Sequence, residues 1–286
     1  PGGLSATLDA VYYDWCTARL ADALGRTTTE AGAFRTDRYV GLFYFMCHEH
    51  TSGRTANDVT KIYLEDGFAA LKKQLSAWAG RDGAYWAEPY FGYYSTNDEW
   101  VYRKHAYMLD AAGVDFVFLD MSNGNYFRDQ LETMLRTWKA IRAEGGHTPQ
   151  IAFMFGDMPT VFVGGVYALR DVLEDPQWQE LFFRWEDKPL ILGNDDGARA
   201  AGGRYKTWTV SGTTPQSKEQ YEAYLNGNPA IKSFVEKEIN AFLENYTVRK
   251  CWAWQTSEKR KGYWDWLQDS PQQPGRDFDG KIEQMA

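Results

Sequence analysis

Long apolar runs, clusters of basic residues and paired cysteines are all missing from this chain. No run of about 18 apolar residues occurs, so we predict no membrane-spanning helix. The 286 residues have a net charge of −8 and no basic cluster, which argues against nucleic acid as a partner. The three cysteines, Cys16, Cys47 and Cys251, lack metal-ligand spacing, so we interpret them as small buried hydrophobic side chains.

Signatures of several enzyme classes are missing too. There is no Gly-x-Ser-x-Gly elbow and no phosphate-binding glycine loop. His48 and His50 form a His-x-His pair at the end of a predicted strand, a pattern of amidohydrolase barrels, but further ligands are not identifiable. His105 falls on the apolar side of a predicted helix and is interpreted as a hydrogen-bonded core residue. We therefore predict no metal and no cofactor, with a metal-dependent hydrolase built on His48 and His50 as an alternative.

Aromatic residues are abundant instead, at 16% of the chain, including 12 Trp and 18 Tyr. Most are expected to fill the core and a minority to line a cleft. No internal repeat or linker occurs, so the chain is interpreted as one domain over 1–286, in which 1–37 form an N-terminal helix and lead-in. The chain opens at Pro1 without a signal peptide, and we expect a trimmed form of a secreted or periplasmic protein.

Strand-like apolar segments alternate with segments of helical periodicity along the chain. The predicted strands are 40–47, 90–94, 114–119, 151–155, 190–192, 205–210 and 248–254. The predicted helices are 5–25, 58–78, 98–112, 127–144, 161–184 and 218–245. This alternation is typical of βα units and predicts an α/β fold, the (β/α)8 TIM barrel, with an irregular or incomplete last βα unit. A doubly wound open sheet is the alternative, although its glycine fingerprint is missing.

The best-marked unit contains the helix predicted at 98–112. Thr96 and Glu99 have capping-box spacing, which predicts a helix start near Asn97, and Gly113 is the stop signal. The following run, 114–119, is almost entirely apolar, as in a strand buried on both faces of a parallel sheet. Asp120 comes directly after this run.

Acidic residues follow several predicted strands, and the carboxyl ends of parallel barrel strands share one rim. Two carboxylates that flank a glycosidic bond can hydrolyse it, one as acid and one as base or nucleophile. We predict Asp120 and Glu88 as this pair, with Asp195 or Asp157 as replacements for one of them. Asp120 has the alternative role of a cap or turn residue, Glu88 that of a surface acid, and Asp195 that of a turn residue.

Amide, imidazole and aromatic groups near the same predicted rim are candidates to hold a carbohydrate substrate. They are His48, Trp86, Tyr93, Asn123, Trp208, Trp254 and Trp264. Trp254 has barrel packing as its alternative, whereas Trp264 lies in a predicted loop where stacking on a sugar ring is the more natural role.

One stretch of the chain resembles glycoside hydrolase families 71 and 99. The resemblance lies in Gly92–Ser95, Asp98, Val101, Lys104–His105, Met108–Leu109, Ala112–Asp115 and Leu119–Asp120. It matches the second to third strand unit of those families, and Trp86–Pro89 matches a Trp-x-Glu-Pro of bacterial relatives. The resemblance implies a (β/α)8 barrel and an endo-acting α-glucanase or α-mannosidase type of activity, with a carbohydrate as substrate.

The late strand departs from the family 99 pattern. That family carries its catalytic pair in a Glu-x-x-Glu motif, and residues 249–255 contain no such pair. The family's catalytic residues therefore cannot be transferred, and the predicted site depends on the strand-end acids alone. A glycan-binding barrel without catalysis is the second hypothesis.

Overall fold

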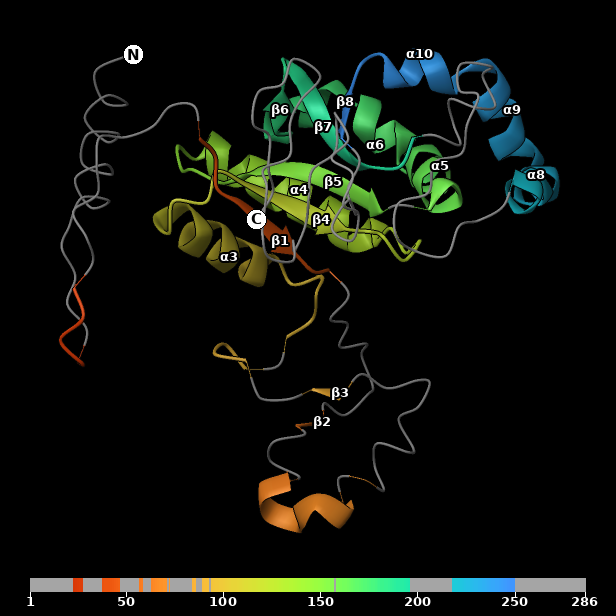
Figure 1. Ribbon diagram of the computed structural model, residues 1–286. Helices are drawn as coiled ribbons and strands as arrows, with labels where there is room; N and C mark the ends of the chain where they lie inside the picture. Colours follow the sequence, from red (N-terminus) through yellow and green to blue (C-terminus); the bar gives the residue numbers. More distant parts are fainter. Residues whose placement is uncertain are drawn as a thin grey trace.

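The computed structural model describes residues 23–27, 38–46, 57–58, 63–70, 72, 84–85, 89–92, 94–156, 158–195 and 218–249. From Glu99 to Arg249, helical segments separate the parallel strands, as Figure 1 shows. None of the described helices is long and apolar enough to cross a membrane. The predicted helix 5–25 and the predicted strand 205–210 lie outside the described residues.

Five parallel strands form the main sheet, adjacent to one another in chain order. They are β1 (Gly41–Tyr44), β4 (Phe116–Asp120), β5 (Gln150–Gly156), β7 (Lys188–Gly193) and β8 (Thr247–Arg249). This confirms an α/β fold with a mainly parallel sheet. Among the described strands the sheet does not close on itself, so the eight-stranded barrel stays a prediction.

A short hairpin adds an antiparallel strand that sequence reasoning missed. Strand β6 (Arg184–Trp185) pairs with β7 through Arg184–Pro189 and Trp185–Lys188. The turn between them places Glu186 and Asp187 at φ 53° and 64°, the left-handed conformation that tight hairpin turns require. A separate two-stranded parallel sheet pairs β2 (Asn57–Asp58) with β3 (Ala84–Tyr85).

The helices are shorter and more numerous than predicted. Within the described residues they include α3 (Glu99–Ala111), α4 (Arg128–Ala143), α5 (Pro159–Ala168), α6 (Arg170–Glu174), η1 (Pro176–Leu181), α8 (Lys218–Gly227), α9 (Pro229–Lys237) and α10 (Ile239–Leu243). The single helix predicted at 161–184 is wrong because Asp175 precedes a proline and is extended, with φ −68° and ψ 118°. The helix predicted at 218–245 is interrupted in the same way at Asn228, before Pro229.

Helix α3 begins slightly later than its capping-box spacing predicts. Its N-cap is Asp98, whose carboxylate accepts the Trp100 N–H at 2.9 Å. Thr96 lies two residues earlier and is buried. The predicted stop is confirmed, because Gly113 has φ 75° directly after the C-cap Ala112.

The strand predicted at 90–94 is wrong at its start. Tyr90 and Phe91 lie in a turn in which the Gly92 N–H donates to the Pro89 carbonyl oxygen at 2.8 Å. Pro89 and Gly92, with φ 74° at the glycine, favour a turn over the β-forming tendency of the aromatic residues between them.

Both faces of the main sheet are covered by apolar side chains, as the run 114–119 predicts. Val117 and Leu119 of β4 join the large core beneath α4 and α5. Phe116 and Phe118 alternate with them and join a smaller cluster on the opposite face, together with Met154 and Leu192 and with Phe183 from the segment before β6. We call this second surface the inner face.

Candidate functional site

The carboxyl ends of the parallel strands meet at one edge of the sheet, as expected. The register aligns Asp120 with Met154, Met154 with Leu192, and Leu192 with Arg249. Paired residues point to the same face of a sheet, and Met154 and Leu192 belong to the inner face. Asp120 and Arg249 are therefore the two charged ends of one row on the inner face.

Asp120 is the last residue of β4 and is partly buried. Its Oδ1 accepts the Ser122 N–H at 2.9 Å, which forms a turn immediately after the strand. It is not a helix cap, because α4 begins at Arg128. Its Oδ2 makes no hydrogen bond within the described part of the chain. One oxygen thus fixes the carboxylate and the other is available to a ligand.

The Asp120 turn packs closely against the end of the neighbouring strand. Gly156 ends β5 with φ 73°, and a Cβ atom added there would lie 2.9 Å from the Cβ of Ser122. The Asn194 N–H donates to the Gly156 carbonyl oxygen at 2.9 Å, which ties the end of β7 to the same point. A glycine is therefore required at 156 on both backbone and packing grounds.

The other predicted residues that the structure describes lie farther from Asp120. Asp195 is buried two residues beyond β7, which lies on the far side of β5 from β4. By strand alternation Asn194, two residues after Leu192, shares the inner face with Asp120, and Asp195 does not. Asn123 is exposed in the loop after Asp120. The structure brings Asp120 and Asp195 to one edge of the sheet without an aligned register.

Arg249 closes the other end of the row. Its side chain is 3% exposed and pairs with Glu186 at 2.8 Å, whereas the Glu186 side chain is 56% exposed. Beside it, the Thr247 hydroxyl donates to the Trp185 carbonyl oxygen at 2.6 Å. The β6–β7 hairpin is thus fastened to β8 by an ion pair and a hydrogen bond.

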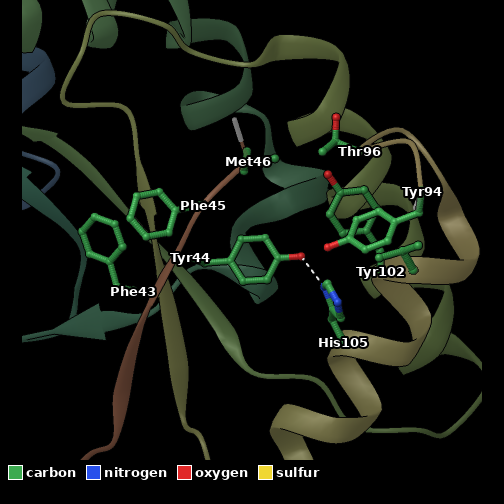
Figure 2. Close-up of a pocket in the computed structure, with 9 residues that line it drawn as sticks. Phe43, Tyr44, Phe45, Met46, Tyr94, Thr96, Tyr102 and His105 are labelled. Carbon is green, nitrogen blue, oxygen red and sulfur yellow. Dashed lines mark hydrogen bonds between the residues drawn. The ribbon is translucent and has the colours of Figure 1, made fainter. Parts of the chain in front are cut away.

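A cavity of about 190 Å³ lies between the end of β1 and the first turns of α3. Figure 2 shows Tyr44 pointing from β1 toward His105 of α3, with Tyr94 and Tyr102 beside them. The Tyr44 hydroxyl and the His105 Nδ1 are 2.8 Å apart. The interpretation of His105 as a hydrogen-bonded histidine facing the core is thereby confirmed.

Burial keeps the polar groups of this cavity uncharged. Burial raises the pKa of Tyr44 far above its usual value, and the neighbouring Tyr102 and Tyr94 raise it further. Burial likewise raises the pKa values of Tyr94 and Tyr102. Burial lowers the pKa of His105 below 6.5, so the imidazole is neutral at pH 7. Sequence reasoning missed this cavity because its walls come from segments about 50 residues apart, and no local pattern connects them.

Most of the predicted site lies outside the described residues. This holds for the acids Glu88 and Asp157, for the histidine pair, and for the aromatic residues predicted to hold the substrate. The residues concerned are Glu88, Asp157, His48, His50, Trp86, Tyr93, Trp208, Trp254 and Trp264. Among the residues that the structure does describe, no three acidic, histidine or cysteine side chains are grouped so as to hold a metal ion.

No protein-family model matches the chain, and no curated protein matches it. Two solved structures of the GH99 endo-alpha-mannosidase from Bacteroides thetaiotaomicron are similar to it. One, in complex with BIS-TRIS-propane, is 15% identical with a TM-score of 0.36, over 75% of this chain and 69% of that chain. The other is 16% identical with a TM-score of 0.31, over 57% and 56%. The likeness is distant and decides neither the fold nor the activity.

Proposed function

We propose that this protein is a glycoside hydrolase that cleaves poly- or oligosaccharides with Asp120 as an essential carboxylate. The observation that carries the proposal is the position of Asp120. It ends a parallel strand at the edge where ligands of α/β sheets bind, it faces the inner side, and its Oδ2 has no described partner. The closed (β/α)8 barrel and a secreted or periplasmic location belong to the same proposal.

The surroundings of Asp120 suit a sugar better than a charged substrate. Phe43, Phe45 and Phe118 lie on the same face near the end of β1, with ring centroids 4.5 Å apart for Phe43–Phe45 and 5.2 Å apart for Phe43–Phe118. Aromatic faces pack against the C–H groups of sugar rings, and Phe45 is 51% exposed, so it offers such a face. The carboxylate supplies the acid–base chemistry that glycosidic cleavage requires.

A second carboxylate is needed, and Glu88, Asp157 and Asp195 are the proposed candidates. Asp195 is separated from Asp120 by one intervening strand, so their backbones are about 10 Å apart across the sheet. Inverting enzymes have carboxyl groups roughly 6.5–9.5 Å apart and retaining enzymes about 5 Å. Because Asp195 does not share the face of Asp120 by strand alternation, this backbone spacing is not a carboxyl separation; NMR of the first product formed distinguishes inversion from retention.

The test is a screen of plant, bacterial and fungal polysaccharides for released sugars, followed by Asp120→Asn on the best substrate. We expect kcat to fall by about 10²–10⁴-fold with the fold unchanged, because the variant keeps the shape and loses the charge. Asp115→Asn is the matched control, since Asp115 lies just before the opposite end of the same strand and its carboxylate accepts the Val40 N–H at 2.7 Å. Near-normal turnover by Asp120→Asn would remove Asp120 from the mechanism.

The second candidate is a glycan-binding protein that does not hydrolyse its ligand. The observation that favours it is the sequence of the late strand, which lacks a Glu-x-x-Glu pair over residues 249–255. Polysaccharide binding in affinity electrophoresis, without any product after prolonged incubation, would select this candidate over the hydrolase.

A further inference from the structure

The cavity between β1 and α3 contains hydrogen-bonding groups that the protein itself does not use. In the described part of the chain, neither the Tyr94 nor the Tyr102 hydroxyl makes a hydrogen bond, and the only partner of His105 is Tyr44. Tyr102 as a residue is 2% exposed, yet its hydroxyl is not among the buried atoms without a partner. The hydroxyl therefore meets open space in the cavity. These groups are therefore reachable from the cavity and can donate to or accept from a ligand there.

The walls define the chemistry of that partner. None of the described residues that line the cavity is charged, so from these residues a charged ligand would lose its hydration without gaining a counter-ion. The remaining walls are aromatic and aliphatic, from Phe43, Phe45, Met46 and Val101. A volume of about 190 Å³ corresponds to roughly six water molecules, which limits the occupant to one small ring.

The cavity also lies at the functional edge of the sheet. Tyr44 of β1 pairs with Leu119 of β4. The residues that follow them, Phe45 and Asp120, therefore lie side by side at the carboxyl ends of the two strands. Phe45 is a wall of the cavity, and Thr96 and Tyr94 enter it from the segment that precedes α3. An occupant would therefore lie one strand away from Asp120.

We propose that this cavity binds one neutral pyranose ring, with the Tyr94 and Tyr102 hydroxyls and the His105 imidazole as hydrogen-bonding partners. The proposal rests on the proposed function and deepens it, because it assigns one sugar unit of the substrate to a position beside β1. In this proposal the bound sugar unit lies outside the inner face, on which Asp120 is placed.

The experiment measures binding of methyl pyranosides to the full chain by saturation-transfer NMR and titration. The probes are the neutral methyl glucoside, mannoside and galactoside, with methyl glucuronide as the charged comparison. Tyr94→Phe and Tyr102→Phe remove single hydroxyls without changing the shape of the cavity. Thr96→Leu fills space inside it. Tyr107→Phe is the matched control, because Tyr107 lies on α3, is 75% exposed and does not line the cavity.

At least one neutral pyranoside is expected to bind, and the charged one is not. Each cavity Tyr→Phe change should weaken binding about five- to tenfold, as the loss of a single neutral hydrogen bond does. Thr96→Leu should abolish binding, and Tyr107→Phe should leave it unchanged. The Tyr→Phe variants keep the test valid if Thr96→Leu does not fold. The proposal is overturned if no neutral pyranoside binds, or if the cavity variants bind as well as the control.

The two proposals fail in different ways. If the protein hydrolyses a polysaccharide and the cavity variants hydrolyse it equally well, the proposed function is retained and the cavity has no part in binding that substrate. Pyranoside binding that depends on the cavity tyrosines, in a protein that releases no sugar from any polysaccharide, would retain the binding site and favour the glycan-binding protein over the hydrolase.

Discussion

The polar groups at the two edges of the main sheet differ in whether they are paired within the protein. On the β7–β8 side, polar side chains are paired within the protein: Arg249 with Glu186, and the Thr247 hydroxyl with the Trp185 carbonyl oxygen. Tyr246, just before β8, also donates from its hydroxyl to the Leu173 carbonyl oxygen at 2.8 Å. This side is therefore closed by its own hydrogen bonds, and its polar residues serve the fold.

On the β1–α3 side, the same kinds of groups surround a cavity. The Tyr44–His105 contact is made, but the Tyr94 and Tyr102 hydroxyls and the second oxygen of Asp120 have no partner in the described chain. The comparison separates structural polar residues from those available to a ligand, which burial alone does not do, since Tyr102 and Arg249 are almost equally buried.

The largest effect on stability is expected at the paired side. Glu186→Ala removes the ion pair of Arg249, whose side chain is 3% exposed, but not its hydrogen bond to the Val248 carbonyl oxygen, and should lower the free energy of unfolding by about 2 kcal/mol. Glu186→Gln keeps a hydrogen-bond acceptor without the charge and should cost less than half as much. Urea denaturation of both variants checks this difference, and equal losses would contradict it.

A smaller effect is expected from the one polar contact that is made on the cavity side. Tyr44→Phe removes the 2.8 Å hydrogen bond to His105 and should lower the free energy of unfolding by about 1 kcal/mol. Tyr94→Phe and Tyr102→Phe should change it by less than about 0.5 kcal/mol, because no described hydrogen bond is lost. Equal losses in all three variants, measured by the same denaturation, would show that the cavity side is paired like the other.

The smallest effect is a dependence on pH. Because burial lowers the pKa of His105 in the folded chain, the unfolded chain takes up this proton first as the pH falls. The contribution of His105 to stability is complete above about pH 6.5 and is lost as the pH falls through the folded-state pKa. Between pH 7.5 and 5.5 the wild type should lose more stability than His105→Gln, by up to about 1.4 kcal/mol, because only the pH unit below 6.5 contributes. A parallel pH dependence in the two proteins would count against a buried neutral His105.

Sequence reasoning was most successful where the hydrophobic pattern of a segment is uninterrupted and fits one type of secondary structure. The runs 114–119 and 151–155 became β4 and β5, and the segment 127–144 became α4 within one residue at each end. It was less successful where prolines interrupt an apolar pattern. The predicted helices at 161–184 and 218–245 are each divided, because the residues before Pro176 and Pro229 are held out of the helical conformation.

The candidate site was less predictable than the sheet. The position of Asp120 at a strand end followed from the apolar run before it, but its turn with Ser122 and its distance from Asp195 depend on how three strands align. The roles of Glu88, Asp157 and the aromatic residues predicted to hold the substrate stay predictions, because these residues lie outside the described part of the chain.

The sequence by itself determined several of the parallel strands, the burial of both faces of β4 and the placement of Asp120 at a carboxyl end. These features depend on hydrophobic pattern and on stop signals such as Gly113, which act within a few residues. Only the tertiary structure decided that Arg249 is paired while Tyr94 and Tyr102 face a cavity, since partners for a side chain come from segments distant in the chain. Local sequence sets where a polar group emerges, and packing sets whether anything in the protein reaches it.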